Sequence, residues 1–133
     1  PELIARNQER LQKKIMSPAH RFSYFDEMIS PDADTLIIAY GITARAARTA
    51  VATLPEDGPP ASLLILKTLW PVPEDLLRQK AANHRRIIVV EMNLGQYVRE
   101  IQRVLPDKAI RFLGQMNGEL ITPGQIREVV IHE

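Results

Sequence analysis

The sequence predicts an α/β fold, an open and mostly parallel β-sheet with helices on both faces. Two observations carry this prediction. Four short apolar segments are nearly continuous in Leu, Ile and Val, which is typical of strands covered on both faces. Segments with helical periodicity separate and follow them, and such strand–helix repetition favours parallel strands joined by right-handed crossovers.

The predicted strands begin after residue 34 and follow one another along the rest of the chain. None of them contains a proline, which would remove a hydrogen-bond donor from the ladder. They are Thr35–Tyr40, Ser62–Leu66, Ile87–Met92 and Ile110–Leu113.

Apolar residues recur at spacings of three and four after Gly41, after Pro73 and after Asn93, which predicts an amphipathic helix at each place. A fourth helix is predicted to begin at Thr122. Thr122 and Gln125 form the pattern of a capping box, and Pro123 suits the first helical position.

Residues 1–34 are predicted to lead into the α/β domain of residues 35–133, the whole forming one compact unit. Leu3–Met16 has the pattern of a helix. Phe22–Phe25 is aromatic enough for a short edge strand, and Ser30–Asp34 is predicted to turn into the first buried strand.

The composition of the 133 residues is that of an ordinary globular domain, with 45% hydrophobic and 25% charged residues. A net charge of +1 gives no electrostatic indication of nucleic acid or an anionic membrane. The absence of cysteine excludes disulfides, a thiol nucleophile and Cys-ligated clusters within the chain, and it fits a cytoplasmic protein. The first residue is Pro1 rather than methionine, so we expect a fragment of a larger subunit.

Ligands of open α/β sheets bind beyond the carboxyl ends of the strands, so those ends are the candidate site. After the first strand, Gly41 either offers backbone N–H groups to an anion or permits a tight turn, with Thr43 capping the next helix. After the second strand, Trp70 is predicted either to pack over the sheet or to contact a partner.

The third strand ends at Glu91, where a buried charge is expensive unless it is paired. One interpretation is that Glu91, Asn93 and Gln96 converge on a ligand or a neighbouring subunit around Gly95. The other is that Asn93 caps a helix and Glu91 pairs with an arginine. Neither assigns a catalytic, cofactor-binding or metal-binding residue.

Other constellations that carry chemistry are not found in the sequence. The three histidines, His20, His84 and His132, are far apart, lack carboxylates at metal-ligand spacing and are expected to be exposed. No Gly-x-Ser-x-Gly motif is present.

Four segments at strand and helix boundaries occur in a specific order and spacing, and together they resemble a known family. They are Thr35–Ala47, Thr68–Pro73, Ile87–Val98 and Gly118–Pro123. The resemblance is to the C-terminal domain of the alpha subunit of 2-oxoacid:ferredoxin oxidoreductases, nearest the 2-oxoglutarate and branched-chain types, and it spans about Asp34 to Val130. It implies a three-layer fold similar to the C-terminal domain of transketolase, with about five strands and Phe22–Phe25 as an antiparallel edge strand.

The resemblance also implies a role. The whole enzyme of this family oxidatively decarboxylates a 2-oxoacid, forms an acyl-CoA and passes electrons to ferredoxin. Thiamine diphosphate, magnesium and iron–sulfur clusters would be held by other domains and by a thiamine diphosphate-binding beta subunit. This domain would then be a non-catalytic assembly domain without a cofactor of its own.

Two other functions are open on the residues alone. A flavodoxin-like or receiver-like binding module would need a hydroxyl-rich loop or an aspartate after a strand, where this sequence has Tyr40 and Gly41. A small independent enzyme would need Glu91 as a general base.

Overall fold

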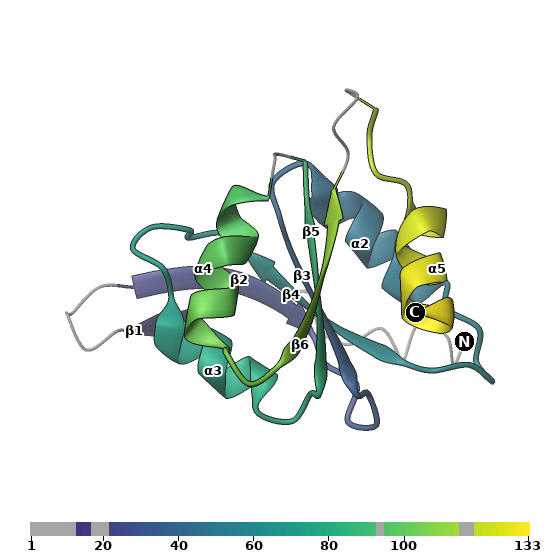
Figure 1. The fold of residues 1–133 in the computed structure, drawn as a ribbon, viewed down its shortest axis with the longest axis horizontal. Helices are drawn as coiled ribbons and strands as arrows, with labels where there is room; N and C mark the ends of the chain where they lie inside the picture. The colour runs from purple at the N-terminus through teal and green to yellow at the C-terminus, as the bar shows by residue number, and fades with distance from the viewer. Residues whose placement is uncertain (1–12, 17–21, 93–94, 115–118) are drawn as a thin grey trace.

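The computed structural model describes residues 13–16, 22–92, 95–114 and 119–133. They form one six-stranded sheet in the order β1-β2-β4-β3-β5-β6, with four helices (Figure 1). The strands are β1 Lys13–Met16, β2 Phe22–Met28, β3 Thr35–Tyr40, β4 Ala61–Leu66, β5 Arg86–Glu91 and β6 Ala109–Gly114. The helices are α2 Thr43–Ala52, α3 Glu74–Ala81, α4 Gln96–Val104 and α5 Pro123–His132.

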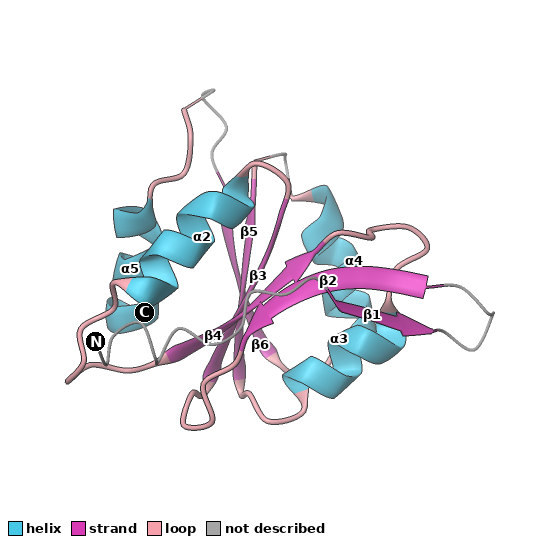
Figure 2. Ribbon diagram, turned by 180° about the vertical axis from the view of Figure 1, so that it is seen from behind, coloured by secondary structure: helices cyan, strands magenta, loops and turns pink. Residues whose placement is uncertain are grey.

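The sheet lies between two helical layers, as predicted. Helices α3 and α4 cover one face, and α2 and α5 cover the other (Figures 1 and 2). Alternate residues of each central strand enter opposite cores because strand side chains point to opposite faces. In β3, for example, Leu36 and Ile38 pack toward α3 and α4, whereas Ile37 packs toward α2 and α5.

Strands β4, β3, β5 and β6 are parallel, which confirms the doubly covered apolar segments as a parallel sheet. The capping box at the start of α5 is also confirmed. The Thr122 hydroxyl accepts from the Gln125 N–H, and the Gln125 side chain accepts from the Thr122 N–H. Ile126, Val129 and Val130 of this helix are buried.

The amino-terminal part differs from the prediction. Lys13–Met16 is strand β1, antiparallel to β2, so the helix predicted over Leu3–Met16 is wrong there. Residues 3–12 of that prediction lie outside the described residues. The predicted edge strand at Phe22–Phe25 is antiparallel to β4 but extends to Met28, and β1 lies outside it. The sheet therefore has six strands in the described residues rather than about five.

Charged pairs hold β1, β2 and α3 together. The Glu27 carboxylate in β2 lies 2.9 Å from Lys13 Nζ of β1 and 2.6 Å from Lys80 Nζ of α3. The Glu27 side chain is only 12% exposed, so solvent screens these pairs less than it would at the surface. Burial raises the pKa of Glu27, but the hydrogen bonds from Lys80 and Lys13 outweigh it and leave this pKa below the ordinary 4.5.

Replacing Glu27 with glutamine is expected to lower the free energy of unfolding by about 1–3 kcal/mol at pH 7, because the charge-assisted hydrogen bond from Lys13 and the ion pair with Lys80 are weakened. The pKa of Glu27 is lower in the folded state than in the unfolded state. The stability that the Glu27 carboxylate contributes is therefore present above the unfolded-state pKa, and it is lost as the pH falls through the folded-state pKa. Urea unfolding of both proteins from pH 7 to pH 3 should show the difference shrinking below about pH 4.5. Asp107→Asn, at an exposed carboxylate, is the control, and an undiminished difference at pH 3 would contradict the prediction.

Candidate site at the carboxyl ends of the strands

The carboxyl ends of β3, β4 and β5 lie at one end of the sheet, where α2, α3 and α4 begin (Figure 1). Parallel pairing places Tyr40 of β3 beside Leu66 of β4, and Ala39 of β3 beside Val90 of β5. The predicted site residues that follow these strands are therefore brought to the same end of the molecule.

Glu91 is fully buried at the end of β5, and its carboxylate accepts three hydrogen bonds. One oxygen accepts from the Tyr40 hydroxyl at 2.5 Å and from the Tyr97 N–H at 3.4 Å. The other accepts from the Val98 N–H at 3.0 Å. Tyr97 and Val98 are the second and third residues of α4, so the carboxylate caps the free N–H groups of this helix.

None of the arginines in the described residues pairs with Glu91, contrary to the second interpretation. The positive end of the α4 dipole and two backbone donors stabilise the negative charge instead. Both oxygens of Glu91 are thus engaged by donors inside the fold.

Three aromatic rings extend from this carboxylate toward the surface. Tyr40 and Tyr97 meet edge to face with ring centroids 5.4 Å apart, and Trp70 meets Tyr97 in the same way at 5.6 Å. Tyr97 is buried, whereas Trp70 is 64% exposed. Trp70 thus packs over the end of the sheet on Tyr97 and presents most of its ring to the outside, and its contact with a partner stays a prediction.

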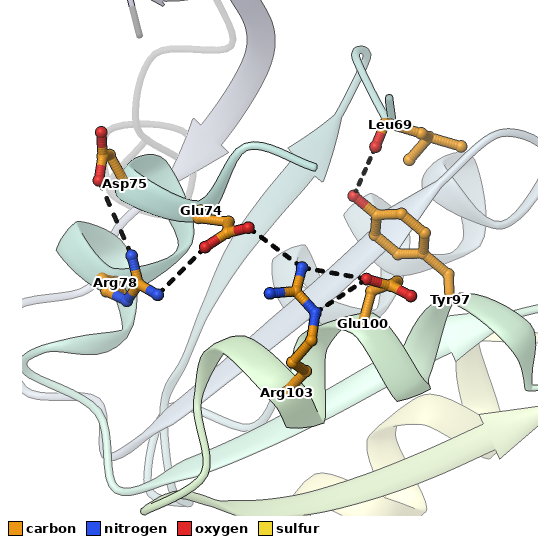
Figure 3. A network of polar contacts seen from close by, with 7 residues as sticks. All are labelled: Leu69, Glu74, Asp75, Arg78, Tyr97, Glu100 and Arg103. Atoms are coloured by element: carbon orange, nitrogen blue, oxygen red, sulfur yellow. Dashed lines mark hydrogen bonds and ion pairs between the residues drawn. The ribbon is translucent and has the colours of Figure 1, made fainter. Parts of the chain in front are cut away.

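The Tyr97 hydroxyl donates to the Leu69 carbonyl at 3.0 Å and thereby ties α4 to the loop after β4 (Figure 3). Burial, followed by the nearby Tyr40, Glu100 and Glu91, raises the pKa of Tyr97 above its ordinary 10.0. The phenol therefore stays neutral and remains a donor across the physiological range.

Exposed charges link α3 and α4 beside this loop (Figure 3). Arg103 of α4 contacts Glu74 of α3 and Glu100 of its own helix, each at 3.1 Å, and Arg78 contacts Glu74 at 3.2 Å. The hydrogen bond from Arg103 lowers the pKa of Glu74 below its ordinary 4.5. These side chains are exposed, so the network orients the two helices more than it stabilises them.

The turn predicted at Gly41 is present, and its positive φ of 62° is a conformation that suits glycine. Thr43 does not cap α2, so that interpretation is wrong: the N-cap is Ile42, and no side chain caps this helix. The buried Thr43 hydroxyl lies 2.8 Å from the Tyr40 carbonyl and 3.0 Å from the Val90 carbonyl. It therefore joins the ends of β3 and β5.

Gly95 is the N-cap of α4 with a φ of 81°, which places it where Asn93 was predicted to act. Gln96 is exposed in the first turn of α4. Asn93 lies outside the described residues, so the predicted convergence of the two amides with Glu91 stays a prediction. Glu91 itself is fully buried.

A groove of about 390 Å³ lies between the start of α2 and the segment before α5. Its lining is mostly apolar. It includes Ile42, Ala46, Met92, Leu120 and Ile121, and Arg45 is the one charged residue among the described residues that line it. The groove was not predicted from the sequence, because Leu120 and α2 are far apart in the chain and only the folded structure brings them together.

Histidines and carboxylates do not assemble a metal centre in the described part of the chain, where no group of three such side chains has the required arrangement. His84 is buried, contrary to the prediction, because its Nδ1 lies 2.7 Å from the Lys80 carbonyl oxygen. His132 is exposed as predicted, and His20 lies outside the described residues. None of the described helices has the length and apolar character to cross a membrane.

Sequence reasoning also missed Tyr40 and Tyr97 as partners of Glu91. Tyr40 could have been predicted as a partner, because it ends a strand predicted to lie in the same parallel sheet as the strand that ends at Glu91. Tyr97 stands six residues after Glu91, a distance that a turn into a helix can bring back onto the strand end.

Comparisons with solved structures support the fold. The chain matches 2-oxoglutarate:ferredoxin oxidoreductase from Magnetococcus marinus, a structure with 2-oxoglutarate, coenzyme A and succinyl-CoA bound, with a TM-score of 0.69 and 26% identity. The match covers 80% of this chain and 19% of that one. A split gene transketolase, described as an inactive beta4 tetramer, matches with a TM-score of 0.68 at 20% identity over 80% of this chain and 39% of its own. The chain thus has a transketolase-like α/β fold.

Comparisons of sequence identify the family. The model of pyruvate:ferredoxin oxidoreductase core domain II matches residues 33–126, most of the chain. The chain therefore belongs to the pyruvate:ferredoxin oxidoreductase core domain II family. This agrees with the resemblance, which begins at about the same residue.

Curated relatives are subunits of oxidoreductases that act on 2-oxoacids. The 2-oxoglutarate synthase subunit KorA of Methanothermobacter thermautotrophicus is 37% identical over 98% of this chain and 35% of its own length. The ketoisovalerate oxidoreductase subunit VorB of the same organism is 33% identical over 90% of this chain and 33% of its own length. The chain spans about a third of the length of these relatives, and the flavodoxin-like or receiver-like alternative gains no support from them.

Proposed function

We propose that this chain is an assembly domain of a 2-oxoacid:ferredoxin oxidoreductase, a thiamine diphosphate enzyme that converts a 2-oxoacid to an acyl-CoA and reduces ferredoxin. Membership of the core domain II family and the identity to KorA and VorB support the enzyme class. One observation of this chain supports a non-catalytic role. Both oxygens of Glu91, the buried carboxylate at the carboxyl end of the sheet, accept hydrogen bonds from Tyr40 and from the start of α4.

The residues of this chain do not fit the cofactors of the whole enzyme. Iron–sulfur clusters are held by cysteine thiolates, and the sequence has no cysteine. Magnesium is bound through carboxylates and the phosphates of its ligand, and the described residues hold no cluster of acidic side chains to share it. The proposal therefore assigns thiamine diphosphate, magnesium and the clusters to other domains and to a partner subunit in the cytoplasm.

Calorimetry tests the proposal on the purified chain. We expect no heat of binding with thiamine diphosphate and Mg²⁺, and no oxidation of 2-oxoglutarate or 2-oxoisovalerate in the presence of coenzyme A and ferredoxin. The chain should instead be retained by the remaining polypeptides of the oxidoreductase from the same genome on an affinity column. Tight binding of thiamine diphosphate to the chain alone would refute the assignment.

A further inference from the structure

The exposed large hydrophobic side chains of the described residues all lie toward one end of the sheet. Ile42, Trp70 and Leu120 follow the carboxyl ends of β3, β4 and β6 and are 64%, 64% and 59% exposed. Phe22 and Tyr24 begin β2, which is antiparallel to β4 and therefore starts where β4 ends. None of the described loops at the opposite end exposes a large hydrophobic side chain. Exposed apolar side chains gathered at one place indicate an interaction surface.

Contacts within the fold make this region continuous. Trp70 packs on Tyr97, and Tyr97 packs on Tyr40, which directly precedes the Gly41 turn and Ile42. Ile42 and Leu120 then line the same groove of about 390 Å³. The apolar side chains thus extend from the loop after β4, past the start of α2, to the segment before α5.

Two unpartnered arginines flank this region. Of the lysines and arginines in the described residues, only Arg45 and Arg99 have no ion pair, hydrogen bond or ring contact within the described part of the chain. Both are exposed. Arg45 lies in the first turn of α2 at the groove, and Arg99 lies near the start of α4.

The position of Arg45 is unfavourable for the helix that carries it. The N-terminal end of a helix is electropositive and favours acidic side chains, and neither α2 nor α4 has an acidic residue in its first turn. In contrast, α3 begins at the same end of the sheet with Glu74 and Asp75. The N-terminus of α2 has no side-chain cap, whereas that of α4 is already occupied by the Glu91 carboxylate. The two free cations and the uncapped end of α2 make a positive field that an external carboxylate would relieve.

We propose that Ile42, Arg45, Trp70, Arg99 and Leu120 form a docking surface, the carboxyl-end surface, for an acidic polypeptide segment that also carries apolar side chains. The apolar side chains of that segment would fill the groove and cover Trp70, and its carboxylates would pair with the two arginines. The inference rests on the proposed function, because it places the partner in another domain or subunit of the same oxidoreductase.

The test uses substitutions for which folding and docking predict opposite effects. Arg45→Glu puts an acidic residue in the first turn of α2, which no side chain caps, and Arg99→Glu changes an exposed side chain without an ion pair, so thermal unfolding should show a Tm close to that of the wild type. Ile42→Ser places a good capping residue at the N-cap of α2, and Leu120→Ser removes an exposed side chain. Arg85→Glu at the opposite end of the sheet, where the Arg85 side chain is 85% exposed, is the matched charge control.

Binding of the chain to the remaining domains and subunits of the oxidoreductase from the same genome, expressed separately, would be measured by calorimetry. We expect the double Arg→Glu variant and the double Ser variant each to bind at least tenfold more weakly, and Arg85→Glu to bind within twofold of the wild type. The wild-type Kd should rise with NaCl more steeply than that of the double Arg→Glu variant.

Wild-type affinity in every variant would overturn the inference and leave the proposed function standing. A wild-type chain that binds none of these polypeptides would overturn both. Sedimentation of the chain alone gives the third outcome: a dimer that these same substitutions dissociate would assign the surface to a second copy and overturn the acidic partner.

Discussion

Replacement of Glu91 by alanine is expected to lower the free energy of unfolding by about 3–5 kcal/mol, a large part of the stability of a domain of this size. The carboxylate is fully buried and is the acceptor for the Tyr40 hydroxyl and the Tyr97 and Val98 N–H groups. Alanine leaves these three donors without that acceptor, the Tyr97 and Val98 N–H groups in a buried position, and it leaves a cavity where the side chain was.

Urea unfolding at pH 7 measures this effect, with the m-value as the check that the unfolded state is unchanged. Two milder substitutions divide it into parts. Tyr40→Phe removes one donor and should cost about 1–2 kcal/mol, whereas Glu91→Gln keeps one oxygen acceptor and should fall between Tyr40→Phe and Glu91→Ala. If Glu91→Ala lost less than about 1 kcal/mol, the carboxylate would not be what holds α4 to the end of β5.

The central strands were predictable because both of their faces are buried. A continuous apolar segment indicates a buried strand whichever strands pair with it. For this reason Thr35–Tyr40 was predicted with its observed ends. Strand β1 was not predictable in this way. Lys13–Met16 carries two lysines, and it is a strand because β2 pairs with it and because Glu27 binds Lys13. Its pairing and its charge partner both come from the tertiary structure.

The location of the candidate site was predictable from the sequence, but the hydrogen-bond partners of Glu91 were not. Glu91 at the end of an apolar strand indicated a buried carboxylate that needs a partner, and the structure confirms the burial. The partners could not be read from the sequence, because Tyr40 reaches Glu91 only when β3 and β5 lie side by side. The Val98 N–H becomes available only because it lies in the first turn of α4, where no preceding helical carbonyl accepts it.

Replacement of Ile101 by alanine is the second large effect that we expect, at about 2–5 kcal/mol. Ile101 is fully buried on the face of α4 that packs against the sheet, and this helix supplies the N–H groups to Glu91 and the ring of Tyr97. Ile101→Val should cost only about 0.5–1.5 kcal/mol, because most of the volume is kept. Gln102→Ala changes the exposed neighbour in the same helix and should stay within about 0.5 kcal/mol of the wild type.

Two probes show whether α4 unfolds with the rest of the domain. Trp70 is the only tryptophan, and its ring contacts Tyr97 of α4, so its fluorescence reports on this helix, whereas far-ultraviolet circular dichroism reports on all helices and strands. Glu91 joins α4 to the two central strands β3 and β5. We therefore expect both transitions of Ile101→Ala to shift together to lower urea, as in two-state unfolding. A fluorescence transition that precedes the dichroism transition would mean that α4 detaches first and that Glu91 does not couple it to the sheet.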